Sequence, residues 1–166
     1  AHPDIDLRIT ASRHLVDFAR EGIDAAIRYC PATPPNLDTV KLADETISPV
    51  CTLEYSRNLD LAHPDDLSRV TLLHGDLPEN WDAWFREAGC AIRSQPGPRL
   101  GDDTAILQAV LNHQGVALGR SLLVADEIAN SRLIRPFDVE LKASYGYWFV
   151  RPKDTPNIAL TAVQNW

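Results

Sequence analysis

The chain has 166 residues, of which 45% are hydrophobic and 23% charged, and this composition is typical of a folded globular protein rather than a disordered one. Its formal net charge is −7 and its arginines stand singly among acids, so this chain alone is not expected to bind nucleic acid. The three cysteines form no CxxC pair, no apolar run is long enough to span a membrane, and no basic then apolar leader opens the chain. We therefore expect a cytoplasmic location, no disulfide framework and no zinc site.

The first part of the chain is predicted to alternate strands and a helix. Residues 5–9 alternate apolar and polar side chains as a strand does, and residues 15–21 are expected to form a short helix that Gly22 ends. A second strand is predicted over residues 23–29, and the three prolines of the CPATPPN segment that follows favour a loop.

Residues 40–53 are predicted to be extended. Pro49 lies inside this segment, and a proline within a strand usually marks a break or an edge. We expect the chain to cross here from one subdomain to another.

The middle of the chain contains the clearest helix pattern. After a helix start at residues 64–67 and a strand at 71–75, Asn80 is a suitable N-cap. Gly89 stands where a left-handed cap ends the helix. Between these two residues, apolar side chains recur at helical spacing: Trp81, Trp84, Phe85 and Ala88.

The last part of the chain is expected to continue the alternation. Asp102 or Asp103 caps a helix through Asn112 whose apolar face holds Ile106, Leu107, Val110 and Leu111. A buried strand at residues 115–120 precedes a helix at 122–129 that Ser121 can cap, a strand at 141–150, and a final helix starting at Thr155. Strands alternating with helices indicate an α/β architecture with largely parallel sheets.

The order of these segments resembles the effector-binding domain of LysR-type transcriptional regulators, in the branch of the glycine-cleavage activator and the AmpR-type regulators. Six stretches that cover nearly the whole chain carry the resemblance: HPDIDLRIT, LVDFAREGIDAAIRY, ISPVCT, LLHGDLPENWDAWFREAG, LQAVLNHQGVALGRSLLVADEIANSRLIRPFD and YWFV.

The resemblance implies a periplasmic-binding-protein-like α/β fold with two Rossmann-like subdomains joined by two crossing strands. By analogy, subdomain I comprises residues 1–48 plus 149–166, and subdomain II comprises residues 49–148. A small effector is expected in the cleft between them, with no cofactor and no metal. Such domains pair as homodimers within tetramers, and the helix at 122–129 is the expected partner surface. Promoter DNA is bound through an N-terminal winged helix-turn-helix that this chain lacks, together with one strand and helix of subdomain I.

Six residues are candidates for contacting the effector. In the family, two small hydroxyl residues open the helix that begins here at Asp103 and Thr104. Because Asp103 brings a negative charge to this anion-binding position, we expect the effector to present an amine or hydroxyls. Plain helix capping is the alternative explanation for the acids.

The other candidates lie at strand ends or on strands. Tyr147 stands where AmpR-like members close on the ligand, although an aromatic there can simply pack in a strand. Arg28, Tyr29 and His74 end strands, where residues that face solvent are also common. The helical spacing of Trp81 and Trp84 favours core packing over an aromatic binding site.

Two other classes of protein remain open from the sequence. A solute-binding protein of a transporter has a similar fold and would need an export signal. A small α/β enzyme would need catalytic groups, and the sequence contains no GxSxG elbow, no phosphate loop and no metal-ligand spacing. We therefore expect a regulator and not an enzyme.

Overall fold

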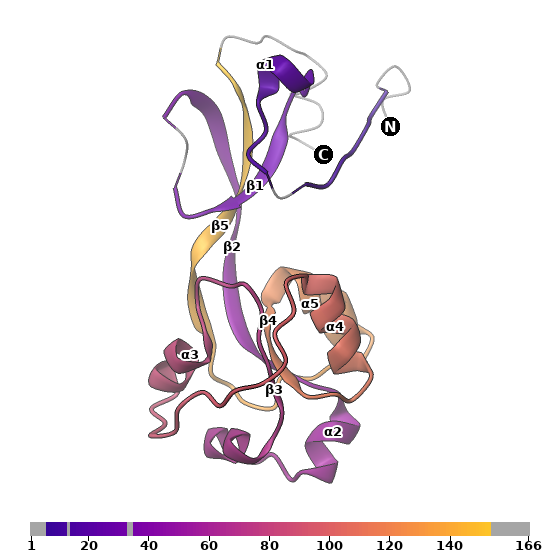
Figure 1. Cartoon of the computed structure of the whole chain (residues 1–166), viewed down its shortest axis with the longest axis vertical. Coiled ribbons are helices and arrows are strands. Elements are labelled where there is room, and N and C mark those ends of the chain that lie inside the picture. Colours follow the sequence, from indigo (N-terminus) through magenta and orange to yellow (C-terminus); the bar gives the residue numbers. More distant parts are fainter. Residues whose placement is uncertain (1–5, 13, 33–34, 154–166) are drawn as a thin grey trace. The chain divides into compact units, whose positions relative to one another are not determined.

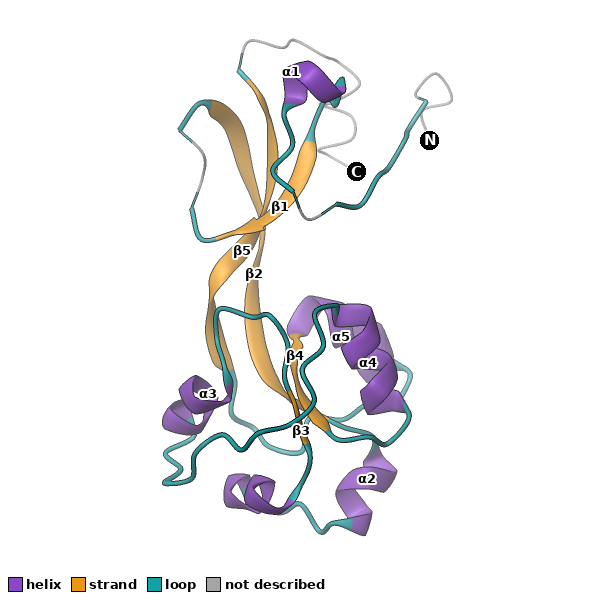
Figure 2. Ribbon diagram, viewed as in Figure 1, coloured by secondary structure: helices purple, strands orange, loops and turns teal. Residues whose placement is uncertain are grey.

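The computed structural model describes residues 6–12, 14–32 and 35–153 of the chain. It divides into two compact units, the first formed by residues 1–44 and 145–166 and the second by residues 45–144. Two strands carry the chain from one unit to the other: β2 (Leu37–Val50) and β5 (Leu141–Pro152). Figures 1 and 2 show the elements of each unit.

Unit 2 is a three-layer α/β arrangement around the strands β2, β4 (Val116–Arg120) and β3 (Leu72–Leu73), in that order. Successive residues of a strand point to opposite faces, and the two buried clusters follow this alternation. Val116 packs in one cluster with α3 (Trp81–Glu87), whereas Ala117 packs in the other with α4 (Asp103–Leu111) and α5 (Ser121–Ala129). Helices therefore cover both faces of the sheet, with α4 and α5 on one side and α3 on the other (Figure 2).

The helix α3 confirms the pattern predicted for it. The Asn80 side chain accepts a hydrogen bond from the Ala83 N–H, and Gly89 has a φ of 70°. Trp81 and Trp84 are 1% and 0% exposed, so these two rings belong to the core. Each indole N–H donates to a backbone carbonyl, which satisfies the polar atom of a buried ring.

Two shorter helices complete unit 2. The helix α2 (Leu53–Asn58) is capped by the Thr52 hydroxyl, and the 3₁₀ helix η1 (Pro64–Arg69) begins with a capping box between His63 and Asp66. The predicted helix start at residues 64–67 is thus confirmed as a 3₁₀ turn.

Unit 1 contains α1 (Phe18–Glu21) and the antiparallel pair of β1 (Ala26–Cys30) with β5. Asp17 caps α1, and Gly22, with a φ of 64°, ends it as predicted. The first half of β2 lies on the other side of β5.

Four local expectations are wrong or changed. Residues 6–9 form no strand, and the 83% exposure of Ile9 shows that nothing covers this stretch within the described residues. The sheets are not largely parallel: β3 and β4 pair parallel, but the β1–β5 and β2–β4 pairs are antiparallel. Helix alternation fixes a parallel direction only for strands joined by a helical crossover, as β3 and β4 are.

The other two concern Pro49 and Ser121. β2 continues through Pro49, which pairs with Leu118 one residue before the strand ends, so the missing N–H costs at most one bond of the ladder. Ser121 is the first residue of α5 and not its cap, because its hydroxyl is bonded to Glu45 instead. The final helix predicted from Thr155 lies outside the described residues.

Candidate functional site

The first turn of α4 is the centre of the candidate site. The Asp102 side chain accepts a hydrogen bond of 3.0 Å from the Ala105 N–H and is therefore the N-cap. Asp103 and Thr104 follow as the first helical residues, and both are exposed. Since the cap bond is made by the Asp102 side chain, neither Asp103 nor Thr104 is needed to make it.

Asp103 belongs to a line of three charged side chains. Arg120, at the end of β4, donates to Asp103 Oδ2 at 2.9 Å and lies 3.5 Å from Oε2 of Glu45 on β2. The Arg120 side chain is only 10% exposed and that of Glu45 is fully buried, whereas that of Asp103 is 47% exposed. Two carboxylates and one guanidinium leave this line with a net negative charge, and Asp103 is its solvent-facing end.

A cavity of about 210 Å³ lies beside these groups, between α4, α5, β4 and the end of β2. Asp103, Thr104 and Arg120 supply its charged and hydroxyl groups. The rest of its lining is apolar: Val50, Ile106, Leu107, Val110, Ala117, Leu118, Gly119, Leu123 and Val124. A mostly apolar wall with a few polar groups gathered together is the composition expected of a small-molecule site.

In unit 1 the structure brings Tyr29 and Tyr147 together. They are register partners in the β1–β5 pair, with ring centroids 5.1 Å apart, and the Tyr145 ring lies 5.3 Å from that of Tyr29. These ring contacts make the three tyrosines a small aromatic cluster on this sheet, and all three are partly exposed.

Arg28 is held within unit 1. Its guanidinium donates to the Val16 carbonyl at 3.2 Å and lies 5.5 Å from the centre of the Phe18 ring. These contacts fix α1 and the chain before it against β1, so Arg28 has a structural role in this conformation.

His74 does not line this cavity. Its backbone N–H donates to the Pro98 carbonyl, its own carbonyl accepts from the Leu100 N–H, and its Nε2 lies 3.0 Å from the Gln95 carbonyl oxygen. His74 thus holds the segment of residues 95–100 against the end of β3.

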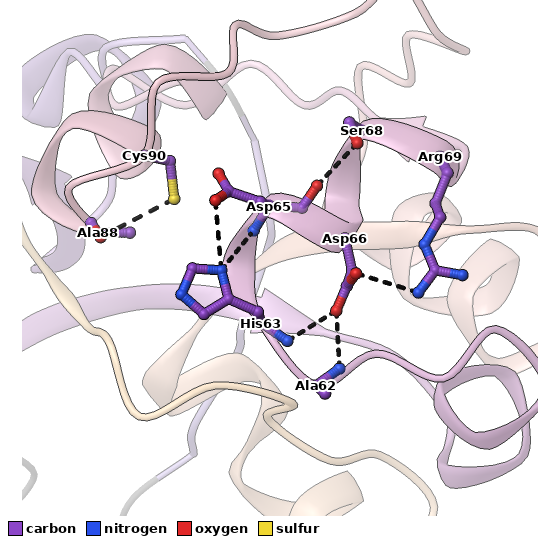
Figure 3. Close-up of polar contacts among 8 residues, drawn as sticks. All are labelled: Ala62, His63, Asp65, Asp66, Ser68, Arg69, Ala88 and Cys90. Atoms are coloured by element: carbon purple, nitrogen blue, oxygen red, sulfur yellow. Dashed lines mark hydrogen bonds and ion pairs between the residues drawn. The ribbon is translucent and has the colours of Figure 1, made fainter.

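A cluster of cysteine, histidine and aspartate in unit 2 is not a nucleophilic centre. Figure 3 shows Cys90 facing the turn that carries His63 and Asp65. Burial, followed by the neighbouring Asp65 charge, raises the pKa of the Cys90 thiol, whereas a reactive cysteine needs a lowered pKa.

The neighbouring carboxylate has a structural role too. Hydrogen bonds from the His63 and Ala62 N–H groups, and then one from Arg69, lower the pKa of Asp66, which caps the turn (Figure 3).

Neither a metal centre nor a membrane span is found in the described part of the chain. Across residues 6–12, 14–32 and 35–153, no three His, Cys, Asp or Glu side chains are grouped so that they could hold an ion. No helix within these ranges is both long and apolar enough to cross a bilayer.

Sequence reasoning missed Arg120 and Glu45 as members of the site. The sequence does contain a feature that could have identified Arg120: it is a charged residue that ends an apolar strand directly before a helix. No comparable feature marks Glu45, because its burial depends on α5, which begins 76 positions further along the chain.

The architecture is that of a two-unit α/β binding fold in which two strands connect the units, and the comparisons with known proteins agree. The family described as the LysR substrate binding domain matches residues 1–165. The transcriptional activator AmpR of Rhodobacter capsulatus is 33% identical over 167 residues, which cover all of this chain and 57% of that protein. The glycine cleavage system transcriptional activator of Escherichia coli K12 is 34% identical over 152 residues, covering 90% of this chain and 50% of that protein.

The solved structures give the same result. The effector domain of AmpR from Pseudomonas aeruginosa matches with a TM-score of 0.84 and 30% identity, over 99% of this chain and 80% of that chain. The chain therefore belongs to the LysR substrate-binding domain family, as the resemblance implied, and it spans about half the length of the curated relatives it matches. These relatives are transcriptional activators, which favours a regulatory domain over an enzyme or a transporter's solute-binding protein.

Proposed function

We propose that this chain senses a small metabolite for a transcription factor, and that the first turn of α4 holds the metabolite. The proposal depends on one observation. Asp102 makes the cap bond of the helix, whereas the next two residues, Asp103 and Thr104, line the cavity. A helix N-terminus also offers backbone N–H groups that no residue within the helix accepts.

The chemistry of the ligand follows from the charges. Asp103 is the exposed end of a charged line with a net negative charge, so a ligand with an amine or hydroxyl groups fits it better than an anion. The Thr104 hydroxyl can donate or accept, and the apolar wall suits an aliphatic portion of the ligand. A simple dicarboxylate should bind poorly, because its charge would meet that of Asp103.

We also propose that Tyr147 contacts the ligand, as the resemblance to AmpR-like members implies, and we include Tyr29 because its ring lies against that of Tyr147. Arg28 and His74 are weaker members, since both already make contacts within their own units. We further propose that subdomain I comprises residues 1–48 plus 149–166 and that subdomain II comprises residues 49–148.

A binding experiment tests the ligand chemistry. This chain is screened by thermal shift against amino acids, primary amines, polyols and dicarboxylates, and the best compound is titrated by calorimetry. Thr104→Val and Tyr147→Phe remove one hydroxyl each and should weaken binding about tenfold, the effect of losing one buried hydrogen bond. Thr71→Val and Tyr55→Phe, at residues that do not line the cavity, are the matched controls. Tight binding of a dicarboxylate, or equal losses in the controls, contradicts the proposal.

We propose that the complete protein is a cytoplasmic regulator that binds promoter DNA through a segment outside this chain. The net charge of −7 supports a division of labour in which the chain itself does not bind DNA. A gel-shift comparison of this chain with the complete protein on the promoter of its own gene tests it. Retardation of the DNA by this chain alone contradicts it.

Self-association through α5 is the remaining part of the proposal. Leu122 and Leu123 are 48% and 43% exposed, which is unusual for two adjacent leucines of one helix. Leu122→Glu should shift the complete protein towards monomers in analytical ultracentrifugation, and an unchanged distribution would remove α5 from the interface.

A further inference from the structure

Glu45 is the one charged residue that is buried in the described part of the chain, with 1% of its surface exposed. It is also the residue at which β2 enters unit 2. A buried carboxylate is costly unless charged and hydrogen-bonded partners surround it. The partners of Glu45 therefore indicate what it does.

Glu45 caps α5 from a distant part of the chain. The residue before α5, Arg120, makes no side-chain cap bond. Instead, Glu45 Oε1 accepts from the Leu122 N–H at 3.0 Å and from the Ser121 hydroxyl. The same hydroxyl accepts from the Thr46 N–H at 3.2 Å. These bonds tie the first turn of α5 to the part of β2 that leads to unit 1.

Arg120 lies between this anchor and the candidate site. Its Nη1 donates to Asp103 at 2.9 Å, while its Nε lies 3.5 Å from Glu45 Oε2, which accepts no hydrogen bond from the described residues. Attraction between charges rises as their distance falls. Both carboxylates therefore attract the largely buried Arg120 guanidinium. In this structure it lies closer to Asp103, the exposed carboxylate, than to Glu45.

We propose that Arg120 is a positioning residue that couples occupation of Asp103 to the anchoring of β2 by Glu45. A ligand amine or hydroxyl that engages Asp103 weakens the hold of Asp103 on Arg120, and Arg120 then tightens on Glu45. The link between β2 and α5 becomes firmer, at the point where the chain passes to unit 1. The coupling rests on the proposed function, because it takes Asp103 as part of the effector site.

Amide hydrogen exchange measured by NMR on this chain tests the coupling without any ligand. Asp103→Ala removes the competing carboxylate and leaves the Asp102 cap. Exchange of the Leu122 and Thr46 amides should become slower by roughly threefold or more, the low end of couplings between contacting charged groups. A purely structural role for the Asp103–Arg120 pair would give faster exchange instead.

Two further variants complete the design. Arg120→Lys keeps the charge but presents a single ammonium in place of a guanidinium that serves two carboxylates. In this background Asp103→Ala should no longer slow the two amides. Asp126→Ala removes an exposed carboxylate of α5 outside the line and should leave them unchanged. The amide of the fully buried Val116, which donates to the Thr71 carbonyl, reports any global loss of stability.

Unchanged or faster exchange in Asp103→Ala overturns the proposal, and so does an equal slowing in the Arg120→Lys background. Failure of the proposed function is distinguishable, because no ligand would then bind at Asp103, while Asp103→Ala would still slow the exchange of the Leu122 and Thr46 amides.

Discussion

Replacing Glu45 should lower the free energy of unfolding, and the loss should be larger for Glu45→Ala than for Glu45→Gln. Glu45→Ala removes the acceptor of the Leu122 N–H and the Ser121 hydroxyl and leaves Arg120 with one carboxylate. Breaking a buried ion pair on one side costs about 3–5 kcal/mol. Glu45→Gln keeps an oxygen that can accept both hydrogen bonds and loses only the charge facing Arg120, so it should cost about 1–3 kcal/mol.

The control is Glu54→Ala. The Glu54 side chain is 71% exposed and lies 3.8 Å from His113, so its loss should change the free energy of unfolding by no more than about 0.5 kcal/mol. Urea unfolding followed by tryptophan fluorescence suits this series, because Trp81 and Trp84 are buried in the same unit. A cost of Glu45→Ala no larger than that of the control, or a Gln variant as costly as the Ala variant, would refute the reasoning.

Three further substitutions test separate parts of the account. Trp84→Ala should cost about 3–5 kcal/mol in urea unfolding, because the ring is 0% exposed; a small cost with a loss of ligand affinity would instead mark a binding residue. Burial raises the pKa of Cys51 to about 11, so the folded thiol stays protonated while the unfolded one ionises. Stability should therefore fall as pH rises from about 9 to 11, and more steeply in the wild type than in Cys51→Ala; parallel pH curves would contradict this. Asp102→Ala should lower the unfolding free energy by about 1 kcal/mol and Asp102→Asn by much less, whereas equal losses would show that the cap bond to Ala105 does not matter.

The parts of the fold that depend on neighbouring residues could be predicted from the sequence. The cap at Asn80, the apolar spacing behind it and the left-handed Gly89 all act within a few residues, and the helix α3 has these features. The choice between Asp102 and Asp103 as the cap of α4 remained open, because either carboxylate can reach the first-turn N–H groups.

The parts that depend on distant pairing could not be predicted. Alternation at residues 5–9 satisfies the pattern of a strand, but a strand also needs a hydrogen-bonded neighbour, which sequence periodicity does not supply. Ser121 carries a good capping side chain, yet its hydroxyl bonds to Glu45 from a strand far along the chain. The charged line of the candidate site was missed for the same reason, since it joins β2, α4 and β4.

The central claim is that an effector binds at the first turn of α4, beside the cavity that Thr104 lines. An ¹⁵N NMR titration of this chain with the strongest compound from the screen tests it most directly. The account predicts that the amide signals of Thr104 and Gly119, which line the same cavity, shift along one saturation curve, while that of Gly89 stays in place. Shifts that leave Thr104 unaffected, or that saturate at different concentrations for Thr104 and Gly119, would contradict it.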